Sequence, residues 1–274
     1  MQIISVVRDF DMYNRLVKDN PFYPKGAVFT AFDNNKENLT IPIRYNSFLN
    51  AYDYSNEDWF VFCHEDWEVK EELEKRLKSL DKNSLYGVIG TVFNWQTVHP
   101  HRIKGQIKNS HKDGSGKILV GYQVKNFPEV GTFDCQCLIV HSSLIKKYKL
   151  RFDENLTWDL YVEDFCISAR ENHTVSSRIL QLNCQHYSFG NVTERFYRQH
   201  EYLQNKYINS KNTYITVCSD NIIGKTPPFY YKILKIILII RPKILSFFYQ
   251  KKLTKSGVLS IKILKIPVYR KKVK

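Results

Sequence analysis

Three side chains that can bind a metal ion follow directly on an apolar run. Residues 59–63, Trp-Phe-Val-Phe-Cys, have the composition of a short buried strand, and His64, Glu65 and Asp66 come next. Because residues along an extended strand alternate between its faces, we expect His64 and Asp66 to point to one side and Glu65 to the other. Hard divalent cations prefer oxygen ligands such as carboxylates. The sequence therefore predicts a cation site at the end of this strand, and a solvated surface turn is the alternative.

The hydrophobic pattern around these residues predicts the elements that position them. We expect strands at residues 2–7, 27–32, 59–63, 86–93, 132–140 and 175–183, and helices at residues 11–19, 47–51, 69–80, 142–148 and 159–171. The polar segment 94–130 is typical of a loop that forms an acceptor or lid region. This alternation predicts an α/β fold with a mostly parallel sheet and helices on both faces. Ligands of such sheets bind beyond the carboxyl ends of the strands, which is where His64 and Asp66 stand.

The positive charge of the chain is confined to its C-terminal end. The net charge is +14 over 274 residues, and residues 225–274 hold 14 Lys and Arg without one Asp or Glu. Residues 1–224 therefore carry 27 basic and 27 acidic side chains and are neutral. A nucleic-acid-binding domain would carry its basic residues on the folded body. The neutral body argues against a nucleic-acid partner, although a protein that binds nucleic acid through its basic tail remains an alternative.

The cysteines and the N-terminus point to a cytoplasmic protein. None of the six cysteines forms a Cys-x-x-Cys pair, and most lie in apolar runs, where a free thiol behaves as a small hydrophobic side chain. A zinc site that combines Cys135, Cys137, Cys184 and His186 would match no common ligand spacing. Residues 1–7 lack the basic and long apolar regions of a signal peptide and predict a strand instead.

Taken in order, these motifs resemble a known family of enzymes. The order begins with a strand at residues 2–7, a strand that ends in Asp33 and the strand end His64-Glu65-Asp66. It continues with a helix that carries Glu163-Asp164 and closes with His-x-Ser-x-Gly at residues 186–190. The series resembles the GT-A nucleotide-sugar glycosyltransferases, in particular the bacterial family-2-like branch in which His-x-Asp replaces Asp-x-Asp. The resemblance covers residues 2–200. It implies a Rossmann-like GT-A fold with a mixed, mostly parallel sheet.

The resemblance also implies an activity. The expected enzyme is a hexosyltransferase-type glycosyltransferase that moves a sugar from a nucleotide-diphosphate donor to a saccharide or lipid-linked acceptor in bacterial surface polysaccharide synthesis. A divalent cation, Mn²⁺ or Mg²⁺, would offset the charge of the leaving diphosphate. A carboxylate would take the proton of the acceptor hydroxyl. Inversion at the anomeric carbon is expected, because it needs only one base.

The same resemblance implies a role for individual residues. It places the metal at His64, Asp66 and His186, the donor at Asp33, Asn34, Asn46 and Asp134, and catalysis at Asp164, the expected general base, with Glu163 beside it. Asp159 is a second candidate for the base. The alternatives are an Asx turn for Asp33, a helix cap for Asn46, a structural histidine for His186 and favourable helix-dipole contacts for Glu163-Asp164. The family commonly has Gly where this chain has Cys135.

The C-terminal segment 229–274 is strongly apolar and basic. Its uncharged run 236–240 is far shorter than the ~20 residues that span a bilayer, and Pro242 interrupts the segment. We expect a basic amphipathic helical extension that lies in the headgroup region of an anionic membrane, with Lys and Arg reaching the lipid phosphates. A helical pair packed on the catalytic domain or a dimer contact is the alternative.

These expectations combine into one domain organisation. The predicted domains are a catalytic domain at residues 1–208, a linker at residues 209–228 and a membrane-association segment at residues 229–274. The predicted location is the cytoplasm, peripheral on the inner face of the cell membrane. A non-catalytic membrane-associated protein with the same fold is the remaining alternative.

Overall fold

The computed structural model describes residues 1–99, 101–190, 192–226, 249–253, 258–263 and 266–272. The chain divides into two compact units, one made of Met1–Thr97 and His101–Thr226 and the other of Val98–Pro100 and Pro227–Lys274. Each is described by itself below. All the residues predicted to act in metal binding, donor binding or catalysis belong to the first unit.

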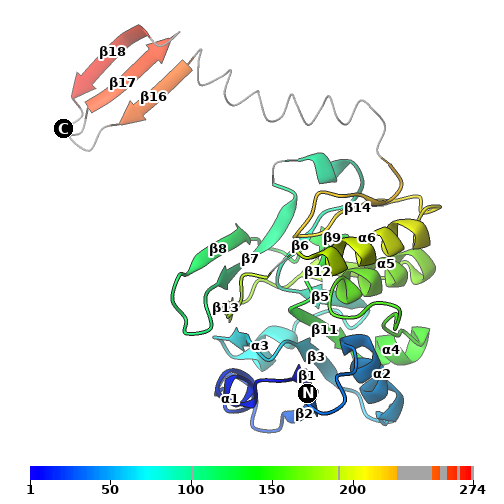
Figure 1. Cartoon of the computed structure of the whole chain (residues 1–274). Coiled ribbons are helices and arrows are strands. Elements are labelled where there is room, and N and C mark those ends of the chain that lie inside the picture. The colour runs from blue at the N-terminus through cyan, green and yellow to red at the C-terminus, as the bar shows by residue number, and fades with distance from the viewer. Residues whose placement is uncertain (100, 191, 227–248, 254–257, 264–265, 273–274) are drawn as a thin grey trace. The chain divides into compact units, whose positions relative to one another are not determined.

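A seven-stranded mixed sheet forms the centre of the first unit (Figure 1). Its strands, in sheet order, are β2 (Val28–Asp33), β1 (Gln2–Val7), β3 (Trp59–Cys63), β11 (Cys137–His141), β5 (Ser84–Gly87), β12 (Ser176–Ile179) and β9 (Glu129–Val130). The pairs β1–β2, β1–β3 and β5–β12 are parallel, whereas β11 is antiparallel to both of its neighbours. The α/β class that the hydrophobic pattern predicts is confirmed, with a mixed sheet.

Helices cover both faces of this sheet because its central strands are apolar on both sides. Along β3, Phe60 and Phe62 enter one core cluster, whereas Val61 and Cys63 enter the other. The first cluster packs under α2 (Ile41–Ala51), α4 (Ser142–Tyr148), α5 (Tyr161–His173) and α6 (Glu194–Lys206). The second packs under α1 (Phe10–Tyr13), its π-helical continuation η1 (Asn14–Lys18) and α3 (Leu73–Leu77). Strands buried on both faces read as continuous apolar runs, which is why they can be predicted.

A second sheet lies beside the carboxyl end of β3 and differs most from the predicted elements. Its strand order is β10 (Thr132–Phe133), β6 (Gly90–Thr91), β7 (Ile103–Asn109), β13 (Cys184–His186) and β4 (Trp67–Val69), and β8 (Ile118–Tyr122) pairs with β7. The predicted loop at residues 94–130 is therefore wrong in part, because it contains the β7–β8 hairpin after the short 3₁₀ helix η2 (Asn94–Val98). Gly121, at φ 80°, lets the two strands approach, since a Cβ there would lie 2.2 Å from the Gly105 carbonyl oxygen.

The helix predicted at residues 69–80 is also wrong at its start. Val69 closes strand β4, where it pairs with Cys184, and only Leu73–Leu77 form a helix. A strand partner more than a hundred residues away outweighs the local helical pattern, because sheet pairing buries Trp67 and Val69 completely.

Residues 209–226 fold onto the first unit, although their composition predicts a linker. They contribute β14 (Thr213–Tyr214) and β15 (Ile223–Gly224), and Tyr214 and Ile223 are fully buried. The Tyr214 hydroxyl donates a hydrogen bond of 2.5 Å to Oε1 of Glu171 in α5. The compact unit consequently extends to Thr226.

The described part of the second unit is a sheet. Strands β16 (Tyr249–Leu253), β17 (Val258–Ile263) and β18 (Ile266–Lys272) form an antiparallel sheet, so the predicted helical extension is wrong over these ranges. Alternation of β-branched with polar residues in 258–263 favours a strand, and Pro267 is tolerated because β18 is an edge strand. Residues 229–248, including the apolar run 236–240, lie outside the described residues. No helix among the described residues has the length and apolarity to cross a membrane.

Candidate active site

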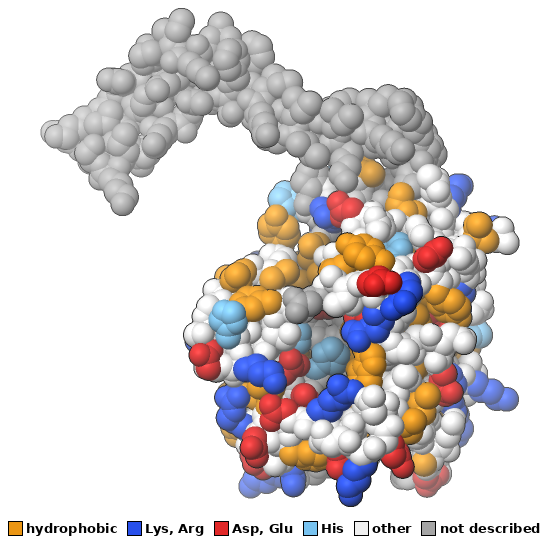
Figure 2. Space-filling model, viewed as in Figure 1, with side chains coloured by type: hydrophobic (Ala, Val, Ile, Leu, Met, Phe, Trp, Pro, Cys, Tyr) orange, Lys and Arg blue, Asp and Glu red, His pale blue; other side chains and the backbone are white. Residues whose placement is uncertain are grey.

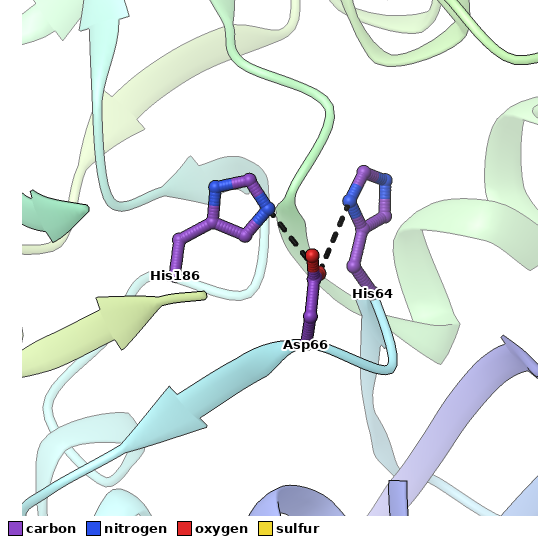
Figure 3. Close-up of side chains that lie close together, drawn as sticks. All are labelled: His64, Asp66 and His186. Atoms are coloured by element: carbon purple, nitrogen blue, oxygen red, sulfur yellow. Dashed lines mark ion pairs between the residues drawn. The ribbon is translucent and has the colours of Figure 1, made fainter. Parts of the chain in front are cut away.

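The turn between β3 and β4 and the end of β13 bring three metal-binding side chains together. The His64 backbone N–H donates to the Gln136 carbonyl, which continues the β3–β11 pairing up to the turn. His186 pairs with Trp67 in the β13–β4 register and therefore lies next to Asp66. One carboxylate oxygen of Asp66, Oδ1, lies 3.8 Å from His64 Nδ1 and 3.2 Å from His186 Nε2 (Figure 3). The three ligand atoms lie within 4.8 Å of one another and could hold a metal ion.

Glu65 points away from this group, as the alternation of an extended strand predicts. Its Oε2 accepts hydrogen bonds from the backbone N–H groups of Arg8, at 2.5 Å, and Asp9, at 3.0 Å. Glu65 thus holds the end of β1 against the turn that carries the metal-binding residues. Of the three side chains His64, Glu65 and Asp66, Glu65 therefore has a structural role.

The hydrogen bonds around His64 leave the correct nitrogen for a metal. The Tyr161 hydroxyl donates its only proton to the Cys135 carbonyl, at 3.0 Å, so its oxygen accepts from His64 Nε2, at 2.8 Å. His64 Nδ1 then carries a lone pair on the side of Asp66. Burial lowers the pKa of His64 more than the neighbouring Asp66 raises it, so the ring is neutral at pH 7. A neutral imidazole whose other nitrogen donates a hydrogen bond is the usual form of a histidine ligand.

An unsatisfied polar atom supports the same interpretation at His186. Its Nε2 is buried and has no hydrogen-bond partner, although it faces Asp66. Burial alone would raise the pKa of Asp66, but His186 and His64 outweigh it and lower that pKa to about 2. The carboxylate is therefore charged, and a divalent cation between it and the two imidazoles would give this nitrogen a ligand bond beside its contact with Asp66. Two imidazoles with one carboxylate fit Mn²⁺ better than Mg²⁺, which takes mainly oxygen ligands.

A cavity of about 420 Å³ is lined by these residues and by further carboxylates. Besides His64, Asp66 and His186, its walls include Asp134, Asp159, Glu163 and Trp158. In Figure 2 histidine side chains lie at the floor of a hollow, with acidic and basic side chains around it and hydrophobic ones along its upper rim. The structure therefore places the metal-binding group and three carboxylates around one space.

Glu163 is the carboxyl group with the most unusual surroundings in this cavity. It stands in the first turn of α5, its residue is 2% exposed, and its Oε2 accepts a hydrogen bond from the Cys135 thiol at 2.9 Å. Burial first, and then the negative charge of Asp134, raise its pKa to about 8. Asp159 differs, because its Oδ2 forms an ion pair of 2.6 Å with Arg195. A buried acid whose pKa lies near neutrality can exchange protons at working pH.

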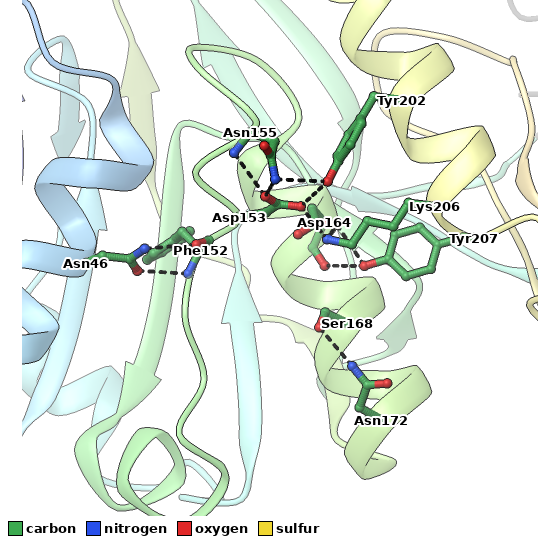
Figure 4. A network of polar contacts seen from close by, with 10 residues as sticks. All are labelled: Asn46, Phe152, Asp153, Asn155, Asp164, Ser168, Asn172, Tyr202, Lys206 and Tyr207. Atoms are coloured by element: carbon green, nitrogen blue, oxygen red, sulfur yellow. Dashed lines mark hydrogen bonds and ion pairs between the residues drawn. The ribbon is translucent and has the colours of Figure 1, made fainter.

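The structure does not bring Asp164 to the cavity. Its residue is 1% exposed, and its Oδ1 accepts hydrogen bonds from Lys206 Nζ and the Tyr207 hydroxyl, both at 2.7 Å. Lys206 also contacts Asp153 at 2.6 Å, and the Tyr202 hydroxyl donates to the same Asp153 carboxylate at 2.7 Å (Figure 4). Successive helix positions point about 100° apart, so Glu163 and Asp164 reach different neighbours. Asp164 ties α5 to α6.

We expect the change Lys206→Met to destabilise the protein strongly. It leaves the buried Asp164 carboxylate and the neighbouring Asp153 without their shared cation, and such a loss costs about 3–5 kcal/mol in the free energy of unfolding. Chemical denaturation measures this difference. Lys78→Met is the matched control, because the Lys78–Glu74 pair is 3.6 Å long and its side chains are 70% and 56% exposed. That control is expected to change stability by less than about 1 kcal/mol. Equal effects of the two changes would contradict the structural role of Lys206.

Three of the residues predicted to bind the donor form hydrogen bonds within the fold and do not line the cavity. Asn46 lies inside α2 and not at its cap; its side-chain amide donates to the Phe152 carbonyl and to Glu154, and its Oδ1 accepts from the Phe152 N–H (Figure 4). Asn34 is 1% exposed and donates to the Leu39 carbonyl. Asp33 closes β2 and accepts from the N–H two residues later, which makes the Asx turn considered as its alternative. Of the predicted donor residues, Asp134 lines the cavity.

Several residues of the site are absent from the sequence-based prediction. Tyr161 orients His64, Lys206 neutralises Asp164, and the Arg8 guanidinium stacks over the Trp158 ring at 4.5 Å from its centroid. A signal for α6 existed, because Phe196, His200, Leu203 and Tyr207 repeat at helical spacing. No such local signal marks Tyr161 or Arg8, whose partners are distant in the sequence.

Comparison with known proteins completes the description. No family model and no curated protein sequence matches the chain. Among solved structures, GalNAc-T7 with UDP, GalNAc and Mn²⁺ aligns with a TM-score of 0.47 and 8% identity over 76% of this chain and 48% of that chain. A197 from STIV aligns with a TM-score of 0.36 and 11% identity, over 83% and 95%. S. aureus TarS aligns with a TM-score of 0.38 and 12% identity, over 96% and 58%. The chain thus spans about half the length of the GalNAc-T7 chain. Likenesses this distant carry no argument about activity.

Proposed function

We propose that this protein is a metal-assisted GT-A glycosyltransferase that moves a hexose-type sugar from a nucleotide-diphosphate donor to a hydroxyl group. One observation carries the proposal: a His-Asp-His group and a buried glutamate with a raised pKa line the same cavity. Sugar transfer from a nucleotide diphosphate needs these two functions on opposite sides of the reacting carbon. One offsets the charge of the leaving diphosphate, and the other takes the proton of the attacking hydroxyl.

In this proposal His64, Asp66 and His186 hold the cation. Mn²⁺, when bound there, neutralises negative charge that develops on the diphosphate. Tyr161 keeps the His64 ring in the orientation and tautomer that metal binding requires. A diphosphate held at this cation would leave the sugar in the cavity that Asp134, Asp159 and Glu163 also line.

We assign the proton acceptor to Glu163. The first expectation, Asp164, is held by Lys206 and Tyr207 and lies outside the cavity lining. Asp159 lies in the lining, but its carboxylate is paired with Arg195 and is less available to an acceptor hydroxyl for that reason. A single base of this kind supports transfer with inversion at the anomeric carbon, because the hydroxyl attacks from the side opposite the diphosphate.

We place the nucleoside end of the donor at the carboxyl ends of β1 and β2. Asp33 closes β2, Arg8 follows β1, and Trp158, on which Arg8 stacks, forms part of the cavity wall. Asp33 recognises the ribose or nucleobase in this arrangement, and Asp134 contacts the transferred sugar. Asn34 and Asn46 support the site through the backbone segments that they hold.

The biological setting that we propose is assembly of a bacterial surface polysaccharide at the inner face of the cell membrane. Residues 225–274 hold 14 Lys and Arg without an acidic residue, and each cation close to an anionic lipid surface contributes on the order of 1 kcal/mol of binding free energy. Such a segment would hold the protein where lipid-linked glycans are built. The neutral charge of residues 1–224 disfavours nucleic acid as the partner.

A thermal-shift screen with nucleotide diphosphates tests the proposed function. We expect UDP or GDP at about 100 times its Kd to stabilise the protein by about 2.7 kcal/mol, which corresponds to roughly 5–10 °C for a unit of this size. The shift should require Mn²⁺ and disappear with EDTA, whereas the matched nucleosides should produce none. If no nucleotide diphosphate raises the melting temperature with any divalent cation, the protein is not a nucleotide-sugar enzyme.

A further inference from the structure

We propose that the acceptor is an amphiphile, a molecule that carries an alkyl or isoprenoid chain next to the hydroxyl that receives the sugar. The proposal rests on the proposed function for the hydroxyl end of that molecule. It goes further in choosing a lipid-linked acceptor over a free saccharide. The mouth of the cavity differs in chemistry from its floor, because exposed apolar side chains surround it.

One wall of the mouth is an apolar strip on the β7–β8 hairpin. Ile107 and Val120 are cross-strand partners, and both line the cavity. The next pair outward is Asn109 with Ile118, and Asn109 lines the cavity as well. Since residues two apart in a strand share a face, Ile118 extends the strip beyond Val120, and it is 55% exposed. The strip therefore runs from the buried Ile107 to the surface.

A second part of the lining, next to the tip of the hairpin, is also apolar. Phe189 and Val192 line the cavity although they are 42% and 44% exposed. The Phe189 ring lies 4.8 Å from that of His111, so Phe189 packs against the tip of the hairpin. Exposed apolar side chains at the mouth of a cavity mark a binding surface. A plain saccharide would leave them in water, whereas a hydrocarbon chain would cover them.

The apolar strip itself carries no charge. Lys108 stands between Ile107 and Asn109 in β7 and therefore lies on the other face of the hairpin, because residues along a strand alternate between its faces. The mouth therefore favours a hydrocarbon chain. The hydroxyl end of such a molecule is small enough to enter the cavity of about 420 Å³.

Binding of alkyl glucosides tests the inference with a defined probe. Methyl, butyl and octyl β-glucoside are titrated into the full-length protein below their micellar concentrations, and affinity is measured by calorimetry. Each methylene that becomes buried is expected to tighten binding about fourfold, so octyl glucoside should bind more than about 50-fold tighter than butyl glucoside. Affinity that does not change with chain length would overturn the inference.

Variants locate this effect on the cavity mouth. Phe189→Ser and Val120→Ser are expected to reduce the gain from butyl to octyl glucoside to less than about fivefold. Ile208→Ser is the matched control, because Ile208 is 68% exposed on the same unit and does not line the cavity. Phe189 is surface-exposed, so its replacement keeps the test valid if Val120→Ser fails to fold. An unchanged chain-length dependence in Phe189→Ser would assign the binding to another surface and refute the proposal.

The outcome remains distinguishable from that of the proposed function. The Mn²⁺-dependent nucleotide shift of the unaltered protein is measured in parallel. A nucleotide shift without chain-length dependence supports the transferase and rejects the amphiphilic acceptor. The opposite result is that the protein binds no nucleotide but shows a chain-length dependence that Phe189→Ser removes. That result supports the apolar binding site and rejects the transferase.

Discussion

The change Glu163→Gln is expected to lower the rate of sugar transfer by about 10²–10⁴-fold, the usual contribution of a positioned general base. Glutamine keeps the size of the side chain but cannot accept the proton of the acceptor hydroxyl. The effect should appear in kcat, because the acceptor can still bind. A coupled assay of nucleotide-diphosphate release measures it, and Glu74→Gln, on an exposed helix position, should leave the rate unchanged.

The pH dependence of the same reaction checks the assignment independently. The pKa of Glu163 is raised to about 8, against 4.5 for an ordinary glutamate, mainly by burial. Below that pKa the carboxyl group is protonated and cannot act as a base, so the rate should rise with pH up to about 8. The Glu163→Gln variant should lose this rise. If instead Asp164→Asn abolishes transfer in the folded fraction while Glu163→Gln does not, Asp164 is the base.

The change Asp66→Asn is expected to remove the metal dependence of the protein. Asp66 supplies a negative charge within 4 Å of both His64 and His186, and its low pKa keeps it ionised at all working pH values. Without that charge the affinity for Mn²⁺ should fall by at least about 100-fold, more than the loss seen for residues that only support a ligand. Electron paramagnetic resonance of free Mn²⁺ measures this affinity directly.

The control for this experiment is Asp113→Asn, which removes an exposed carboxylate from the tip of the β7–β8 hairpin. It should leave Mn²⁺ binding and the nucleotide shift unchanged. Mn²⁺ affinity that is equal in Asp66→Asn and in the unaltered protein would show that the cation, if it binds, does so elsewhere.

The central strands were predictable because their sequence alone carries enough information. Residues 2–7 and 59–63 form β1 and β3 as expected, since strands covered on both faces are continuous apolar runs. The hairpin of β7 and β8 was not predictable in the same way. Lys and Gln alternate with other residues along β7, and a glycine interrupts each of the two strands, so the segment reads as a loop. The composition of the C-terminal segment, apolar and basic, is common to strands and helices, so by itself it does not distinguish the observed strands from the predicted helical extension.

Asn46 and Asp33 illustrate a second limit. An Asn or Asp at the end of an element is compatible with ligand binding, a cap or a turn, because all three use the same carbonyl or carboxylate oxygen. Which one applies depends on the neighbours that folding supplies. For Asn46 the neighbour is the backbone of Phe152, 106 residues along the chain, and no local pattern indicates it.

The sequence alone places His64 and Asp66 on one side of a strand end and Glu65 on the other. Side chains alternate along an extended backbone, and this alternation depends only on consecutive residues. Two matters depended on the folded chain. His186 joins the metal group through the pairing of β13 with β4, and the choice between Glu163 and Asp164 is made by Lys206, 42 residues further on. The sequence does not distinguish two carboxylates at adjacent helix positions. The packing of α6 on α5 pairs Asp164 with Lys206 and leaves Glu163 in the cavity lining.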